Sequence, residues 1–261
     1  MKKITSSKNP LIKEFVQLSA KQSFRNRKKM TILEGSHLAG EYLRVFGAPE
    51  FCLVLSGSKN PEVQEIVSKC ESLNAKIIEL EENIYTKISP VKQGIGVIFV
   101  VKNPTFSEEI DPRANSLILE NVQDAGNLGT ILRSAAAFGV EQIFCSPETV
   151  AAWSPKVLRA GMGAHFVLKI FENQNLAEVI KKLEVPVFAT SLEAEKSIFE
   201  EDLRGNSAWI FGNEGKGVSA ELQNLATKKV IIPQNPQIES LNVAMATTVC
   251  LSERWRQNLE K

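Results

Sequence analysis

A short apolar stretch at residues 117–120 runs into a polar, glycine-containing loop, and a helical pattern then continues to Gly139. The stretch is too short for a helix and turn residues follow at once, so it suits a buried strand. Asn127 is placed to cap the helix, and Arg133 lies six residues further on, so that its long side chain could reach back to the loop. A strand, loop and helix in this order can bind an anion at the helix N-terminus. An ordinary turn with a solvated Arg133 fits this segment equally well.

Two segments nearer the C-terminus have the same character. Residues 208–212 form an apolar run that leads into the glycine-rich residues 213–217. Residues 229–233 form another, which leads into residues 234–242 and a long helical pattern. The three loops place glycines, amides, a carboxylate and a hydroxyl at the carboxyl ends of strands that we expect to be neighbours. Open α/β sheets bind their ligands at this edge.

Taken together, the three segments resemble the signature of the SpoU/TrmH family of RNA ribose 2′-O-methyltransferases, which belong to the knotted SPOUT class. The resemblance covers about residues 117–257, and three motifs in the expected order make it specific. It implies S-adenosyl-L-methionine as the cofactor, a homodimer joined through the C-terminal domain, and a deep trefoil knot formed from Gly212 onward. The sequence pattern alone predicts a mostly parallel sheet with helices on both faces, and the general expectation is against a knot.

The resemblance implies that the cofactor lies against the backbone at Gly212, Ile232 and Leu241. Gly212 would let the backbone approach the ligand closely. The two apolar residues would supply surface for the adenine. Plain core packing also explains Ile232 and Leu241, and both roles can hold at once.

The resemblance also implies five catalytic residues, namely Arg133, Asn127, Glu214, Ser240 and Asn242. Methyl transfer to a ribose 2′-hydroxyl needs aligned reactants and help in removing a proton, but no metal. Arg133 would either activate the hydroxyl or bind the adjacent phosphate and stabilise the developing alkoxide. The second role is chemically easier, because a guanidinium is a reluctant base. We expect Glu214 to fix Arg133, Asn127 and Asn242 to orient the reactants, and Ser240 to lie near the ribose unless it only caps a helix.

The sequence does not contain a complete form of the other common ligand-binding motifs. Gly215 and Lys216 lack the following Ser or Thr and the earlier glycine of a phosphate-binding P-loop. Gly161 and Gly163 begin like a dinucleotide fingerprint, but Phe166 occupies the position of its third glycine. Two histidines and four scattered cysteines provide no close-spaced cluster for zinc. No metal is therefore predicted.

Length and composition predict a globular chain of two modest domains. The chain has 261 residues, of which 43% are hydrophobic and 23% charged. The basic N-terminus lacks the apolar core of a signal peptide, and no apolar run approaches the length of a membrane span. We therefore expect a cytoplasmic protein that does not bind membranes.

The net charge of +1 conceals a polarised distribution. Residues 1–30 contain nine Lys or Arg against a single acid, Glu14, which gives +8 and leaves −7 for the remainder. The nine cations are Lys2, Lys3, Lys8, Lys13, Lys21, Arg25, Arg27, Lys28 and Lys29. With Phe15 and Phe24 among them, this block is typical of a nucleic-acid contact, although a solvated basic face is the alternative. In the family that the chain resembles, this region is an RNA-recruiting domain similar to ribosomal RNA-binding proteins.

The element pattern predicts two α/β units. The first, residues 1–102, is the expected RNA-binding domain, with helices at about 10–18, 36–46, 61–73 and 81–88 and strands at 30–33, 51–55, 76–80 and 96–101. Residues 103–115, with two prolines and no clear periodicity, form the expected linker. The second unit, residues 116–261, is the expected SPOUT methyltransferase domain. Its strands are expected at about 116–119, 142–145, 166–170, 185–190, 208–212 and 229–232, before a last helix at 241–258.

The resulting functional hypothesis is S-adenosyl-L-methionine-dependent methylation of a ribose 2′-hydroxyl in structured RNA. Ribosomal RNA is favoured over transfer RNA as the partner, because the basic N-terminal domain resembles the rRNA-directed branch of the family. The competing hypothesis is a non-catalytic RNA-binding or ribosome-assembly factor on the same fold. Gln234 and residues 243–246 depart from the usual family pattern, which affects the expected shape of the cofactor pocket more than the expected activity.

Overall fold

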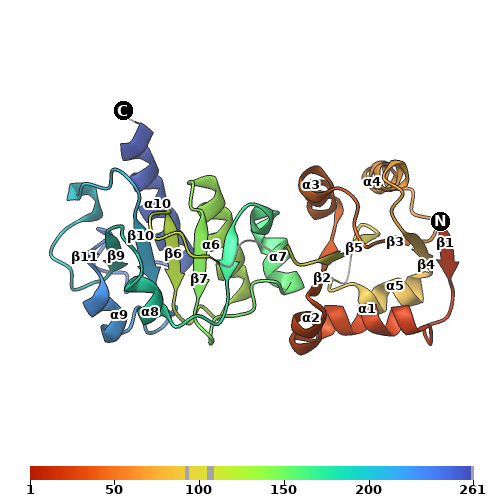
Figure 1. Ribbon diagram of the computed structural model, residues 1–261, viewed down its shortest axis with the longest axis horizontal. Helices are drawn as coiled ribbons and strands as arrows, with labels where there is room; N and C mark the ends of the chain where they lie inside the picture. The colour runs from red at the N-terminus through yellow and green to blue at the C-terminus, as the bar shows by residue number, and fades with distance from the viewer. Residues whose placement is uncertain (92–93, 105–108, 260–261) are drawn as a thin grey trace. The chain divides into compact units, whose positions relative to one another are not determined.

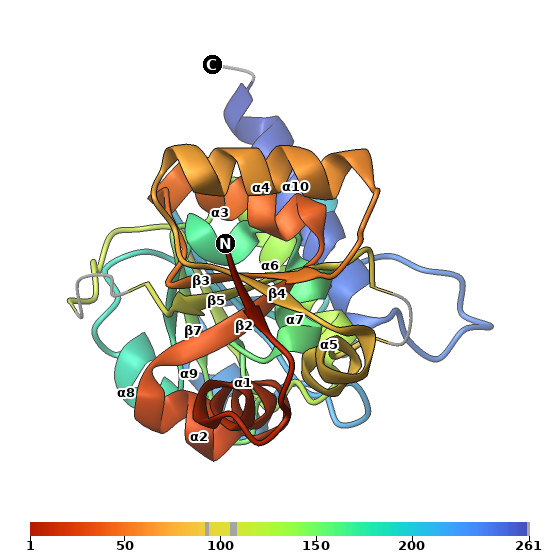
Figure 2. The ribbon, with the colours of Figure 1, turned by 90° about the vertical axis from the view of Figure 1, so that its right-hand side faces the viewer.

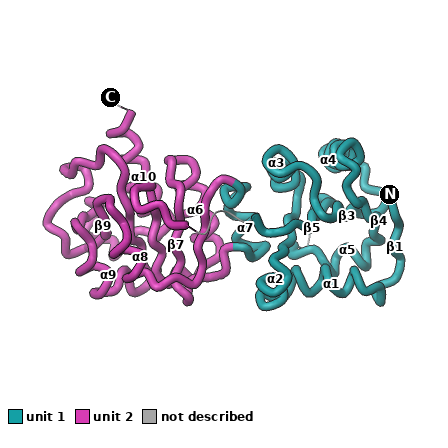
Figure 3. The backbone as a smooth tube through the Cα atoms, viewed as in Figure 1, with its two compact units in different colours: residues 1–105, 153–166 teal, residues 106–152, 167–261 magenta. Residues whose placement is uncertain are grey.

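The computed structural model describes residues 1–91, 94–104 and 109–259. The chain forms two compact units, of which one comprises residues 1–105 and 153–166 and the other residues 106–152 and 167–261 (Figures 1 and 3). These units differ from the predicted domains because residues 153–166, expected in the second domain, pack with the first. Residues 105–108 of the predicted linker lie outside the described residues.

Unit 1 is built on a five-stranded mixed sheet. Its strand order is β1 (Lys2–Ile4), β4 (Ile77–Leu80), β3 (Phe51–Leu55), β5 (Val97–Lys102) and β2 (Met30–Glu34). β1, β4 and β3 run parallel, whereas β5 is antiparallel to both β3 and β2. The predicted strands of this unit are present, and β1 is an additional short edge strand that the sequence pattern did not indicate.

Helices cover both faces of this sheet. α1 (Pro10–Ala20), α2 (Gln22–Lys28) and α5 (Glu82–Ile88) lie on one face, and α3 (Ser36–Phe46) and α4 (Pro61–Ser72) lie on the other (Figure 2). α1 begins as its sequence predicts, because the Asn9 side chain accepts a hydrogen bond from Leu11 N at 3.0 Å and Pro10 occupies the first turn.

Several residues of the basic N-terminal block, residues 1–30, are buried in unit 1. Phe15 and Phe24 are buried in the core cluster beneath the sheet, so the expectation that they accompany an RNA contact is wrong. Arg25 is also buried, and its guanidinium donates hydrogen bonds to the carbonyl oxygens of Leu18 and Ser19 at 2.9 and 3.2 Å. These bonds fix the corner between α1 and α2, because a buried guanidinium needs acceptors. The cations that remain exposed are the candidates for RNA contact.

The segment Trp153–Phe166 packs onto unit 1 through α7 (Pro155–Gly161) and a 3₁₀ turn, η1 (Ala164–Phe166). α7 lies against β2, and the Thr31 hydroxyl donates a hydrogen bond to the Trp153 carbonyl at 2.9 Å. The Phe166 ring meets Tyr42 edge to face, with their centroids 5.7 Å apart. The strand predicted at 166–170 is therefore displaced to β8 (Lys169–Phe171), because Phe166 belongs to this aromatic contact.

Unit 2 contains a six-stranded sheet in which every recorded strand pair is parallel. The order is β11 (Lys228–Val230), β9 (Val187–Thr190), β10 (Ala208–Phe211), β6 (Ser116–Leu119), β7 (Gln142–Cys145) and β8. From β6 the chain moves outward through β7 and β8, and it later returns on the other side through β9, β10 and β11. The order of the strands therefore reverses between β6 and β10, which is where open parallel sheets bind ligands.

Both faces of this sheet are covered, as the sequence predicted. Ile118 and Ile210 belong to the apolar cluster that also contains buried residues of α8 (Leu176–Ile180) and α9 (Ala220–Leu225). α6 (Ala125–Ala137) and α10 (Val243–Leu259) pack against each other. Because neighbouring strand residues point to opposite faces, Leu117 and Trp209 provide the buried surface on the other side. Among the described residues, no helix combines the length and apolar character needed to cross a membrane.

A buried arginine anchors α10 to the base of the sheet. The Arg254 guanidinium donates to the carbonyl oxygens of Phe138 and Gly205 at 3.4 and 3.3 Å, and also to the Asn115 side chain. Burial lowers the pKa of Arg254, and these acceptors compensate the buried charge. The anchor fixes the helix that follows the third predicted motif.

Candidate functional site

The first two predicted loops lie side by side at the carboxyl edge of the sheet in unit 2. β6 and β10 are parallel neighbours, and Phe211 is paired in register with Leu119. Glu120 N continues the ladder with a 2.9 Å hydrogen bond to the Phe211 carbonyl. The loops that begin at Asn121 and Gly212 therefore start from adjacent strand ends, as expected for parallel strands.

Glu214 is held by donors from the first loop. Asn127 Nδ2 donates to Glu214 Oε1 at 3.0 Å, Asp124 N donates to the same oxygen at 3.2 Å, and Gln123 N donates to Oε2 at 3.4 Å. Partial burial acts to raise the pKa of Glu214, but the hydrogen bonds from Asn127 and the backbone outweigh it and lower the pKa. Glu214 is thus a fixed carboxylate that binds N–H groups.

The third loop joins the same chain of hydrogen bonds, although the strand before it, β11, pairs with β9 and is not the neighbour of β6 or β10 that the sequence predicted. Asn242 Nδ2 donates to Asn127 Oδ1 at 3.0 Å, and Asn242 Oδ1 accepts from Ala244 N and Met245 N at 2.9 and 3.3 Å. Asn242 therefore caps α10 and also holds Asn127, which in turn holds Glu214. Three predicted site residues from three separate motifs are thus brought together by direct hydrogen bonds.

The cap of α6 differs from the prediction. Asp124 occupies the cap position, and its side chain accepts from Asn127 N at 2.9 Å. The prediction that Asn127 caps this helix is therefore wrong. Because Asn127 lies in the first turn and not at the cap, its side-chain amide is available to bridge Glu214 and Asn242.

The expected pairing of Glu214 with Arg133 is absent from the described part of the chain. Arg133 is exposed on α6, and no hydrogen bond or ion pair with another described residue is recorded for it. Six residues of helix turn the side chain by about 240° after one full turn, so Arg133 and Asn127 do not share a face. Among the described residues, Arg133 thus lies outside the chain of hydrogen bonds that links Asn242, Asn127 and Glu214.

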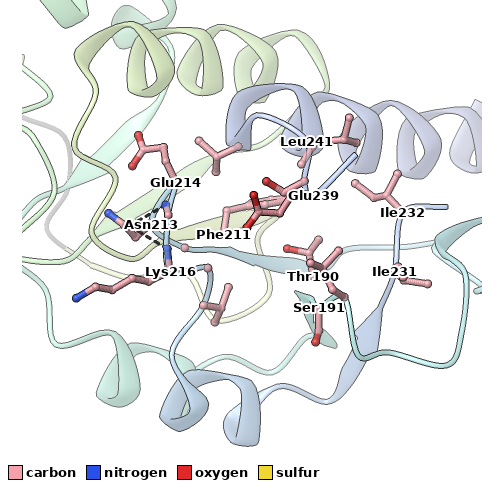
Figure 4. A pocket seen from close by; sticks show the side chains of 18 of the residues that line it. Thr190, Ser191, Phe211, Asn213, Glu214, Lys216, Ile231, Ile232, Glu239 and Leu241 are labelled. Atoms are coloured by element: carbon pink, nitrogen blue, oxygen red, sulfur yellow. Dashed lines mark hydrogen bonds between the residues drawn. The ribbon is translucent and has the colours of Figure 1, made fainter. Parts of the chain in front are cut away.

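A pocket of about 380 Å³ lies beside this chain of hydrogen bonds. Its walls come from the ends of β9 and β10, from residues 213–218, and from residues 231–243 (Figure 4). Gly212, Ile232 and Leu241, the predicted cofactor contacts, all line it. Glu214 and Ser240 also line it, whereas Asn127, Arg133 and Asn242 are not among its lining residues. Since Asn242 supplies the cap of α10, Ser240 is not that cap.

A glycine is required at position 212 because the backbone of residues 217–218 packs closely against it. A Cβ atom at this position would lie 2.0 Å from the Gly217 carbonyl oxygen and 2.4 Å from Val218 N. Residues 213–217 therefore fold back directly over Gly212, and this loop forms one wall of the pocket.

Two residues that the sequence analysis did not single out hold this loop. Asn213 Oδ1 accepts from Gly215 N and Lys216 N at 2.9 and 3.1 Å, as the dashed lines in Figure 4 show. Asn213 Nδ2 donates to the Asn121 carbonyl at 2.9 Å, and Glu120 Oε2 accepts from Ser219 N at 2.7 Å. An asparagine at the start of a glycine-rich turn was the available signal for Asn213.

In the described residues, no group of three or more His, Cys, Asp or Glu side chains is arranged to hold a metal ion. The site consists of a carboxylate, amides and a hydroxyl beside a pocket that is partly open to solvent. Such an arrangement can bind an organic ligand and orient a second reactant next to it.

Residues 114–252 match the family described as SpoU rRNA Methylase. The chain belongs to this family. It is 36% identical to an uncharacterized tRNA/rRNA methyltransferase of Synechocystis, over 97% of this chain and 93% of that protein. It is 30% identical to the Bacillus subtilis 23S rRNA (guanosine(2553)-2′-O)-methyltransferase RlmP, over 95% of this chain and 97% of that protein. The family predicted from the three motifs is thus confirmed.

Solved structures of RNA methyltransferases have the same fold as this chain. A crystal structure of an RNA 2′-O ribose methyltransferase superposes with a TM-score of 0.84 at 30% identity, covering 98% of this chain and 99% of that one. An AdoMet-bound rRNA methyltransferase from Sinorhizobium meliloti superposes with a TM-score of 0.84 at 27% identity, covering 98% of this chain and 97% of that one.

Proposed function

We propose that this protein transfers the methyl group of S-adenosyl-L-methionine to a ribose 2′-hydroxyl of ribosomal RNA. The main support is the chain of hydrogen bonds from Asn242 through Asn127 to Glu214, which lies beside a pocket in a protein of the SpoU rRNA methylase family. Relatives at 30–36% identity are named as rRNA or tRNA/rRNA methyltransferases.

The pocket has the properties that this cofactor requires. It combines apolar surface from Ile232 and Leu241 with backbone at Gly212 that no Cβ shields. When bound, S-adenosyl-L-methionine supplies a methyl group activated by a sulfonium. We assign Gly212, Ile232 and Leu241 to holding the cofactor, and the loop over Gly212 to keeping water away from one side of it.

The remaining residues then act on the RNA. Asn127 and Asn242 hold Glu214 in a fixed geometry, so that the site needs little rearrangement when the RNA binds. Ser240, exposed at the pocket, is placed to donate to or accept from the ribose. Arg133 binds the phosphate next to the reactive nucleotide and stabilises the alkoxide that develops at the 2′-oxygen.

A homodimer would bring Arg133 to a pocket. Arg133 does not line the pocket of its own chain, so a partner copy must provide it if it acts there. Exposed apolar side chains on α10 and on the loop before it offer a surface for such a contact. These side chains are Ile238, Leu241, Met245, Trp255 and Leu259. Large exposed apolar residues of this kind mark interaction sites.

We also propose the deep knot that the family resemblance implies. The support is the way residues 190–198 enclose the strand that leads to Ile232. Ser191 N donates to the Val230 carbonyl at 3.0 Å, Ile231 N donates to the Lys196 carbonyl at 2.9 Å, and Ile198 N donates to the Ile231 carbonyl at 2.9 Å. A chain that passes through such a loop would hold the pocket walls together.

The direct test is methyl transfer to RNA from cells that lack the protein. We expect the purified protein to transfer labelled methyl groups from S-adenosyl-L-methionine to ribosomal RNA, and the modified linkage to resist alkaline cleavage because its 2′-oxygen is blocked. Methylation of tRNA alone would overturn the assignment to ribosomal RNA. RNA binding without turnover on any cellular RNA would instead favour the non-catalytic RNA-binding factor.

RNA recruitment by unit 1 predicts a specific salt dependence. Lys8, Lys13 and Lys21 are exposed, so their joint replacement by Gln should weaken RNA binding and reduce the slope of log affinity against log salt by about 2. The matched control replaces the exposed Lys59, Lys69 and Lys87 of the same unit by Gln. Filter binding over a salt series measures both variants. If the two triple variants weakened RNA binding equally, the N-terminal lysines would belong to a solvated surface and not to an RNA contact.

A further inference from the structure

The pocket lining carries more negative than positive charge. Its lining includes the carboxylates of Glu193, Glu214 and Glu239 and a single ammonium, that of Lys216. The Glu214 carboxylate already accepts hydrogen bonds from Asn127 and from backbone N–H groups. The Lys216 side chain extends away from Glu239 in Figure 4, so it does not neutralise the opposite wall.

Glu193 and Glu239 are held at the pocket by their backbones, while no partner is recorded for their carboxylates. Glu193 N donates to Ser191 Oγ at 3.2 Å, and the Glu239 carbonyl accepts from Gln234 Nε2 at 3.4 Å. Among the residues that the structure describes, no hydrogen bond or ion pair is recorded for either carboxylate. In Figure 4 the Glu239 carboxylate lies among the labelled lining side chains, between Glu214 on one side and Ile232 on the other.

The two carboxylates come from different parts of the fold. Glu193 follows β9, whereas Glu239 precedes α10, and the two segments form separate walls of the same pocket. Both residues are exposed, and no ion pair of either carboxylate with a described residue is recorded, so the pocket lining keeps an excess of negative charge that a cationic ligand would offset. A structure at 27% identity and a TM-score of 0.84 is of an rRNA methyltransferase bound to AdoMet, whose sulfur carries a positive charge.

We propose that Glu193 and Glu239 select the charged cofactor over the uncharged product at this site. S-adenosyl-L-methionine and S-adenosyl-L-homocysteine differ by one methyl group and by the positive charge on sulfur. Methyl transfer removes that charge, so it also removes the attraction to the two carboxylates. The product is then exchanged for fresh cofactor more readily than in a neutral pocket. This inference rests on the proposed function, because it concerns the same pocket and reaction.

The size of the effect follows from Coulomb attraction in a partly solvated pocket. Both residues are exposed, so one carboxylate a few ångströms from a cation is expected to favour it by about three- to tenfold, at an effective dielectric constant near that of bulk water. The preference should decrease as salt is added, because the pocket is open to solvent ions.

Isothermal titration calorimetry on the full chain tests this, with three ligands. The probes are S-adenosyl-L-methionine, S-adenosyl-L-homocysteine and sinefungin, in which a protonated amine replaces the methylated sulfonium. We expect Glu193→Gln combined with Glu239→Gln to weaken both cationic ligands by about tenfold and the homocysteine product by less than about twofold. Glu239→Asp, which keeps the charge, should retain most of the preference. Glu221→Gln on α9, outside the pocket lining, should change none of the three affinities.

The outcomes separate this inference from the proposed function. Equal weakening of all three ligands in the double variant would overturn the inference, because the carboxylates would then bind a part that all three share, such as the ligand ammonium. Unchanged affinities would overturn it too, while leaving the proposed function intact. If the wild-type protein bound none of the ligands, both the proposed function and the inference would be wrong.

Discussion

Gly212→Ala is expected to abolish cofactor binding. The added methyl carbon would lie 2.0 Å from the Gly217 carbonyl oxygen and 2.2 Å from its carbonyl carbon. These are backbone atoms, so no side-chain rotation can relieve the overlap, and residues 213–217 must move away from the strand end. Since this loop is a wall of the pocket, we expect the affinity for S-adenosyl-L-methionine to fall by at least about 100-fold, equivalent to about 2.7 kcal/mol.

The same substitution should lower stability. We expect a loss of about 3 kcal/mol in the free energy of unfolding, at the upper end of overpacking effects. The matched control is Gly215→Ala in the same loop, where the new Cβ would lie 3.6 Å from Asn213 Oδ1, an ordinary contact. Denaturant unfolding measures both variants, and calorimetry measures ligand binding to Gly212→Ala. Wild-type affinity in Gly212→Ala would show that the loop and the cofactor are independent.

The convergence of the three motifs was predictable from the sequence because it follows from topology. Apolar runs that end in polar loops predict parallel strands, and parallel strands in one sheet bring their carboxyl ends to one edge. Glu214 and Asn127 meet for this reason, because β6 and β10 are neighbours in the sheet. Strand β11 lies beyond β9, so it is the loop after β11 that brings Asn242 to Asn127.

The local details could not be read from the sequence in the same way. Asp124 and Asn127 are both good helix caps, and only the folded loop determines that Asp124 occupies the position. Phe15 and Phe24 lie in a basic segment, but the apolar faces of α1 and α2 bury them. The charge composition shows that residues 1–30 are basic, but it does not show which of their side chains face outward.

The segment Trp153–Phe166 shows a second limit of sequence reasoning. Its elements follow β7 in the chain, so sequence continuity assigned them to the second domain. Its packing partners are instead β2 and Tyr42, far away in the sequence. Long-range packing of this kind overrides local order, and no periodicity in residues 153–166 indicates it.

The Arg133→Ala variant is expected to lose methyl transfer while it keeps the fold and the affinity for the cofactor. Arg133 is exposed on α6 and does not line the pocket, so its removal leaves no buried group without a partner. Loss of a charged donor to the developing alkoxide should slow transfer by about 100- to 1,000-fold. Arg133→Lys should also fail, because an ammonium lacks the planar fork that holds a phosphate. Arg113→Ala, which breaks an exposed ion pair with Glu184, is the control and should stay active.

Mixing two inactive variants shows whether Arg133 acts across a dimer interface. We expect Glu214→Gln to be inactive, because it replaces the carboxylate that the N–H groups of Asn127 and of the first loop hold. Arg133→Ala and Glu214→Gln are refolded or coexpressed together, so that about half of the dimers contain one chain of each kind. If Arg133 serves the partner's pocket, each mixed dimer has one site with both residues intact, and about a quarter of the wild-type activity should return. If Arg133 acts within its own chain, every site lacks one of the two groups and no activity returns. Labelled methyl transfer to ribosomal RNA measures this, and full activity of Arg133→Ala alone would end its catalytic assignment.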